Sequence, residues 1–181
     1  MKLFQIIIWL FPIMFMIHDF EEIIMLKAYQ KRNAAYIQTL RKKGKYIPFG
    51  FESTTPVFSI AVAIQFIMFS VISLLSVVFA SYYVWYLFFL GYTAHFIFHI
   101  IIWLRFKKYV PATITAILFL PINCYFVYKV SIMLGYSLLV LLLSIVFSSV
   151  VTAAWIYIAH KLMKTFGAWL AKYETANQPM T

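Results

Sequence analysis

Five long apolar segments constrain the fold of this chain more than any other feature. They cover residues 3–26, 55–80, 83–104, 111–132 and 136–159. About 20 helical residues are needed to cross the hydrocarbon core of a bilayer. Apolar segments of this length can satisfy their backbone groups in lipid only as helices. The sequence therefore predicts an all-α, polytopic transmembrane bundle with five membrane-spanning helices.

The composition excludes a soluble globular domain. Apolar residues make up 65% of the 181 residues and charged residues only 11%, whereas a soluble domain has about 45–50% and about 25%. The single cysteine, Cys124, excludes an internal disulfide. We expect one multi-pass domain of the cell membrane at residues 1–173, which contains a basic cytoplasmic loop at residues 27–54. A flexible polar tail is expected at residues 174–181.

The distribution of basic residues predicts the orientation in the membrane. Lys2 and Lys129 lie on one side of the predicted bundle, and the other 13 of the 15 basic residues lie on the opposite side. Basic residues gather in cytoplasmic loops, so the N-terminus is predicted outside and the C-terminus in the cytoplasm. The net charge of +10 is thereby explained by topology, and no nucleic-acid partner is expected. The basic segment 27–45 is either an amphipathic helix on anionic inner-leaflet lipid or a solvated loop.

Ionisable residues concentrate in two of the apolar segments. The first segment contains three of the five acidic residues beside a histidine, and the third contains two histidines four residues apart: His18, Asp19, Glu21, Glu22, His95 and His99. At 100° per residue, the side chains at 18, 21 and 22 share one helical face, and that at 19 lies about 100° away. One charge at the centre of a membrane helix costs at least about 2.5–3.5 kcal/mol, so the group requires compensation by a metal, protons or partner cations.

The predicted depths of these groups match. His18 and Glu22 lie about 12 and 6 Å from the inner end of their segment, and His95 and His99 about 13 and 8 Å from theirs. Imidazole and carboxylate together are good ligands for Zn²⁺, Fe²⁺ or Mn²⁺. We therefore predict a metal site held by these four residues, with Glu21 as a further ligand or as a catalytic general base. A metal-free proton or substrate relay and a purely structural polar cluster remain as alternatives.

Residues outside this cluster are assigned lesser roles. Three polar residues of other segments are predicted to line the same cavity: Gln65, Asn123 and Thr152. Asp19 is interpreted as a partner of the metal ligands or as facing another helix, and His160 as an interfacial residue. Pro12 and Pro121 each leave a backbone carbonyl without its helical donor and are expected to kink their helices.

The sequence resembles a family of small integral membrane proteins named after an H-x-x-E-E motif. Residues 18–22 read H-D-F-E-E within an apolar first helix. The pair His95 and His99, followed by Arg105 and by Tyr109-Val110-Pro111, resembles the second region of that family, where glycine often follows the proline; here Ala112 stands instead. The resemblance covers about residues 10–130. It supports the site without implying a reaction, because the family has no settled function.

The leading interpretation is a membrane-embedded metalloenzyme that acts on a lipid or another hydrophobic small molecule by hydrolysis or related metal-assisted chemistry. A small proton-coupled transporter is the first alternative, since intramembrane His and Glu also serve as proton relays. A non-catalytic accessory or immunity-type membrane protein is the second.

Overall fold

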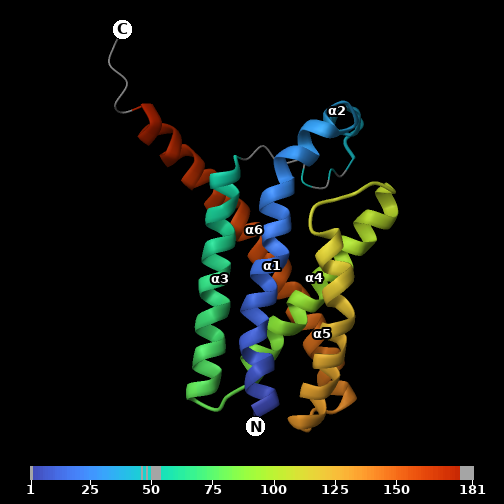
Figure 1. The fold of residues 1–181 in the computed structure, drawn as a ribbon, viewed down its shortest axis with the longest axis vertical. Coiled ribbons are helices and arrows are strands. Elements are labelled where there is room, and N and C mark those ends of the chain that lie inside the picture. Colours follow the sequence, from blue (N-terminus) through green and yellow to red (C-terminus); the bar gives the residue numbers. More distant parts are fainter. Residues whose placement is uncertain (1, 46, 48, 50–53, 176–181) are drawn as a thin grey trace.

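The computed structural model describes residues 2–45, 47, 49 and 54–175. This part of the chain is helical and contains no strand; its helices are α1 (Lys2–Arg32), α2 (Ala34–Lys42), α3 (Thr55–Val78), α4 (Tyr83–Phe106), α5 (Thr113–Met133) and α6 (Leu138–Thr175). All except α2 are long and apolar enough to cross a membrane. The predicted all-helical architecture with five spans is therefore confirmed. α3 and α5 flank α1, and α4 and α6 run obliquely behind it (Figure 1).

Several helices extend beyond the predicted spans. α1 continues to Arg32 instead of ending at residue 26, and α6 continues to Thr175 instead of residue 159. The predicted tail therefore has its first two residues in a helix, and residues 176–181 lie outside the described part of the chain. The reason is physical: apolar composition marks the part of a helix that lipid tolerates, whereas helical hydrogen bonding continues through Lys, Ala and Gln, which are also good helix formers.

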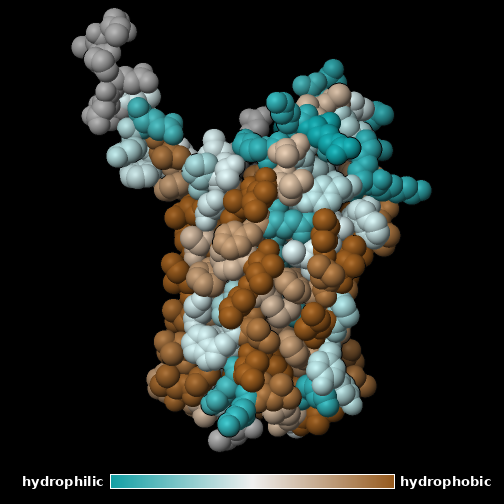
Figure 2. Space-filling model, in the orientation of Figure 1, coloured by the Kyte–Doolittle hydropathy of each residue, from teal (hydrophilic) through white to brown (hydrophobic). Residues whose placement is uncertain are grey.

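The first half of the predicted basic loop is helical, and it packs on the protein. α2 buries Ile37 and Leu40, and Ile37 belongs to a small apolar cluster with Tyr29, Ile102 and Val110. The apolar face of α2 is thus occupied by α1, α4 and the connection after α4. Hydrophilic residues gather at the end of the bundle that carries α2, and apolar residues dominate the flank below it (Figure 2).

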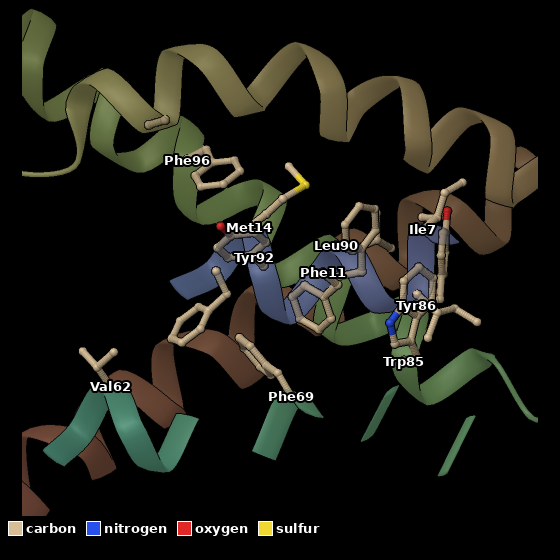
Figure 3. Packing of buried hydrophobic residues seen from close by; sticks show 14 of the residues in the cluster. Ile7, Phe11, Met14, Val62, Phe69, Trp85, Tyr86, Leu90, Tyr92 and Phe96 are labelled. Carbon is tan, nitrogen blue, oxygen red and sulfur yellow. The ribbon is translucent and has the colours of Figure 1, made fainter. Parts of the chain in front are cut away.

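Aromatic rings fill the core around α1. The Phe11 ring lies 4.5 Å from that of Phe69 on α3 and 5.6 Å from that of Phe89 on α4, between ring centroids. Trp85 stacks on Phe89 at 5.1 Å. Figure 3 shows Phe11 and Phe69 meeting between their helices. This packing joins α1, α3 and α4 below the ionisable cluster.

α1 continues through Pro12, and a serine compensates for the missing hydrogen bond. A proline cannot donate to the carbonyl four residues before it, which for Pro12 is that of Ile8. Ser73 of α3, fully buried, donates its hydroxyl to this carbonyl oxygen at 3.2 Å. Pro121 also lies inside a continuous helix, α5.

Candidate metal centre

Four ionisable side chains of α1 and α4 converge inside the bundle. His18 and Glu22 come from α1, and His95 and His99 from α4. One possible ligand atom from each lies within 4.8 Å of the others. The residues His18, His99 and Glu22 are 0%, 2% and 6% exposed. The two helices that the sequence predicts to face each other do so, and the His/Glu group is close enough together to hold a metal ion.

The shortest separations inside the group suit one ion. The Nε2 atoms of His95 and His99 are 2.9 Å apart, and His99 Nε2 lies 3.1 Å from Glu22 Oε1. Neighbouring ligands that each lie about 2.0–2.2 Å from a metal are about 3 Å apart. The ligands of a tetrahedral site are all about 3.3–3.6 Å apart at these bond lengths, so ligand atoms that lie within 4.8 Å of one another would draw together on binding an ion.

Hydrogen bonds fix the orientation of the His18 ring. Thr115 of α5 donates its hydroxyl proton to Glu21 Oε2 at 2.7 Å, and the Thr115 hydroxyl oxygen lies 2.9 Å from His18 Nδ1. Because a hydroxyl has a single proton, Nδ1 must be the donor in this pair. The neutral ring therefore carries its lone pair on Nε2. This buried Nε2 has no hydrogen-bond partner among the described residues.

The His99 ring is oriented in the same way. Its Nδ1 lies 3.2 Å from the carbonyl oxygen of Pro111, which can only accept, so Nδ1 donates and Nε2 carries the lone pair. Metal-binding histidines commonly donate their second ring N–H to a carbonyl or to a carboxylate system. Both histidines thus present an Nε2 lone pair, and neighbouring protein groups maintain this tautomer.

Glu21, predicted as a further ligand or as the general base, is not brought into the group of four. Its carboxylate caps the first turn of α5: Oε2 accepts from the backbone N–H of Thr115 at 2.8 Å, and Oε1 from that of Ile114 at 3.3 Å. Oε1 also accepts the Tyr109 hydroxyl proton at 2.8 Å. A carboxylate at a helix N-terminus is stabilised by the unpaired N–H groups and the helix dipole. Glu21 therefore acts on the site through Thr115 and His18.

Tyr109 lies in the connection between α4 and α5. Burial raises the pKa of its phenol, and the hydrogen bond to Glu21 and the Glu21 charge raise it further. The phenol consequently stays protonated and keeps donating to Glu21.

Thr115, Tyr109 and the Pro111 carbonyl were not assigned roles from the sequence. The available signal was the Tyr109-Val110-Pro111 turn, which carries part of the family resemblance. Ala112, the residue that follows, is buried and adopts a left-handed conformation with φ of 65°. A residue without a β-carbon adopts this conformation at no steric cost, which accounts for the glycine expected at this position.

A cavity of about 510 Å³ adjoins the ionisable group and is lined by α1, α3, α4 and α6 and by Ile47 and Phe49 of the connection between α2 and α3. The predicted lining residues Gln65 and Thr152 both contribute to its wall, and Gln65 Oε1 accepts the indole N–H of Trp155 at 2.9 Å. Asp19 and His160, which had been assigned lesser roles, also line it. Most of the remaining wall is apolar.

Asn123, the third predicted lining residue, lies elsewhere. It is fully buried in α5, and its Nδ2 donates to the Thr93 hydroxyl of α4 at 3.4 Å. Asn123 therefore lies at the α4–α5 interface and does not line the cavity.

Comparison with known proteins agrees with the resemblance found in the sequence. No curated protein and no solved structure matches the chain. A family model described as "protein of unknown function with HXXEE motif" matches residues 9–126. The matched region includes the motif at 18–22, both α4 histidines and the connection that orients them. Because this match extends over more than half of the 181 residues, the chain belongs to the HXXEE family.

Proposed function

We propose that this protein is an integral membrane metalloenzyme that acts on a lipid or another hydrophobic small molecule. In this proposal one Zn²⁺, Fe²⁺ or Mn²⁺ ion is held by His18, Glu22, His95 and His99. The observation that carries it is the inward lone pair of the buried His18 Nε2, which has no hydrogen-bond partner among the described residues and lies with three other ligand atoms.

A cation satisfies this group better than protons do. His18 Nε2 and His99 Nε2 are acceptors because their Nδ1 atoms donate outward. Glu22 Oε1, 3.1 Å from His99 Nε2, also lacks a hydrogen-bond partner in the described structure. Protons on His95 Nε2 and on the Glu22 carboxyl would each serve one acceptor, whereas one divalent ion can bind all four groups. An uncompensated polar group in a low-dielectric interior is costly, which argues against a purely structural cluster.

The remaining residues of the site would orient the metal ligands and bind the substrate. When bound, a divalent ion polarises a substrate oxygen and lowers the pKa of a neighbouring water. Thr115 and Glu21 hold the His18 ring, and the Pro111 carbonyl holds the His99 ring. The cavity beside the cluster gives a hydrophobic substrate a water-poor place to bind, and Asp19 adds a second carboxylate to the wall next to Glu22.

The cavity favours an enzyme over a carrier. It reaches Phe15 and Phe69, whose rings pack at 4.9 Å on each other, and Phe69 packs on Phe11 at 4.5 Å. This aromatic layer lies below the cluster, whereas proton relays and ion pathways in membranes are marked by ionisable residues.

We propose that the basic end of the bundle, which carries α2, lies in the cytoplasm. Of the 15 basic residues, 13 are predicted at this end, and basic residues gather in cytoplasmic loops. Since α2 packs its apolar residues on the protein, its basic side chains would meet anionic inner-leaflet lipid by charge and without insertion.

Elemental analysis of detergent-purified protein tests the metal site. We expect one equivalent of a transition metal in the wild type and its loss in the double variant His95→Ala/His99→Ala. His160→Ala is the matched control, because this histidine is exposed and bonds to the Ile156 carbonyl of its own helix. Wild-type protein that contains no metal and takes up none of the three ions in an anaerobic titration would contradict the proposal.

The enzymatic part needs a separate measurement. Metal-loaded wild type and the double histidine variant are incubated with a total membrane lipid extract, and the products are compared by mass spectrometry. We expect at least one lipid to be consumed only by the wild type. Identical product profiles, with metal bound to the wild type, would assign the ion a structural role.

A further inference from the structure

We infer that the cavity binds a single-chain amphiphile with an uncharged, oxygen-containing head group, and that the His/Glu cluster meets this molecule at the junction of its head and chain. The inference rests on the proposed function, whose substrate class it names. It is argued from the length of the cavity, the place of the cluster along it, and the charges of its wall.

The cavity is long and narrow. Its lining residues extend from Phe58 to Phe69 on α3 and from Phe88 to Ile102 on α4. At 1.5 Å per helical residue these stretches are about 16 and 21 Å long. A volume of about 510 Å³ spread over that length suits one hydrocarbon chain better than two. A diacyl lipid is therefore a poor fit.

Three of the four residues of the cluster line the cavity, near its middle: Glu22, His95 and His99. His95 lies seven residues after Phe88 and seven before Ile102, or about 10 Å from each end along α4. Below the cluster the wall is aromatic, and the rings of Phe69 and Phe88 pack at 5.9 Å. Val62 and Phe69 lie along one face of α3, with Phe69 close to Phe11 of α1 (Figure 3). About 10 Å of chain can thus extend from the cluster to an aromatic floor.

The charges of the wall favour an uncharged head group. Among the described residues that line the cavity there is no lysine or arginine, and the acidic members are Asp19 and Glu22. One divalent ion balances two carboxylates, so the loaded site carries no net charge to attract an ionic head. Gln65 and Thr152 supply neutral hydrogen-bonding groups on the opposite helices.

Two of the residues that line the cavity are exposed. Phe98 and Ile156 are 47% and 37% exposed, which shows that the cavity is open beside α4 and α6. An amphiphile can therefore enter from the hydrocarbon of the membrane, where such molecules are most concentrated.

Native mass spectrometry of the detergent-purified protein tests this inference. The protein is incubated with straight-chain primary alcohols of graded length and, in parallel, with the matching fatty acids. We expect one alcohol per wild-type chain, with a clear maximum in chain length, and weaker retention of the acids. Phe69→Ala removes part of the floor and should shift the maximum to longer alcohols; Phe88→Ala does the same if the first variant does not fold.

A substitution that fills the cavity provides the second test. Val62→Trp should abolish alcohol retention, whereas Ile67→Trp, on the exposed side of the same helix, should not. The inference is overturned if the bound alcohols show the same distribution of chain lengths as the mixture that was added. It is also overturned if Phe69→Ala and Phe88→Ala both retain the chain lengths that the wild type retains, or if fatty acids are retained better than alcohols. Metal content is measured on the same samples. Metal without a bound alcohol refutes this inference alone, and an alcohol without metal uptake refutes the proposed metal site.

Discussion

Removing the Thr115 hydroxyl tests whether the hydrogen bond behind His18, a proposed metal ligand, contributes to metal affinity. This hydroxyl lies 2.9 Å from His18 Nδ1 and 2.7 Å from Glu21 Oε2. Thr115→Val keeps the shape of the side chain and the backbone bond to Glu21, but leaves the buried Nδ1 proton without an acceptor. The His18 tautomer that directs the Nε2 lone pair into the cluster then loses its support.

The expected effect is a weaker metal affinity. Loss of a hydrogen-bond partner behind a metal-binding histidine typically costs 10- to 100-fold in affinity, which corresponds to about 1.4–2.7 kcal/mol. Thr115→Ser retains the hydroxyl and should bind nearly as well as the wild type. Thr113→Val is the matched control, because the Thr113 hydroxyl lies in the same turn and donates to the Val110 carbonyl at 2.7 Å.

Competition with a fluorescent chelator in detergent measures these affinities, and thermal unfolding of the metal-free proteins reports their stability separately. The reasoning is refuted if Thr115→Val binds the ion as tightly as the wild type, or if Thr113→Val loses as much affinity as Thr115→Val.

Two further predictions concern packing between the helices. A β-carbon at Gly91 of α4 would collide with the Thr152 hydroxyl of α6, so Gly91→Ala should lower stability by about 1–3 kcal/mol in thermal unfolding. Gly167→Ala is the control and should be neutral or stabilising, because a β-carbon there meets its nearest atom at 3.4 Å. Equal effects of the two substitutions would contradict the close approach of α4 and α6 at Gly91. Ser73→Ala removes the donor to the Ile8 carbonyl and should cost about 0.6 kcal/mol, the average measured for hydrogen bonds between membrane helices, and no more than about 1.7 kcal/mol. An unchanged unfolding temperature would contradict a stabilising role for this bond.

Hydropathy identified the spans because lipid requires long apolar helices, and this requirement is local in sequence. It did not identify the ends of α1 and α6, since a helix that leaves the membrane keeps its hydrogen bonds while its composition becomes polar. The fold of α2 was one of two alternatives, because its nine residues contain few apolar positions, and those positions pack on Tyr29 and Val110, which only the tertiary structure brings near.

The pairing of His18 and Glu22 with the α4 histidines was predictable, because helical periodicity and depth restrict where each side chain points. The placement of Glu21 was not. It shares the face of His18 by periodicity, but the N-terminus of α5 provides N–H donors about 94 positions later in the chain. Sequence separation on this scale conceals a contact unless the tertiary arrangement is known, and the role of Thr115 was hidden for the same reason.

The position of the ionisable cluster has a consequence for synthesis of the chain. His18 emerges from the ribosome 77 residues before His95, which at 5–20 residues per second is about 4–15 s. During this interval α1 holds buried acidic groups whose partners on α4 and α5 have not been made, at about 2.5–3.5 kcal/mol for each charge that enters the bilayer. The first helix therefore gains its final stability only after the later helices have been inserted, and variants at His95 or Thr115 should deprive α1 of this late stabilisation.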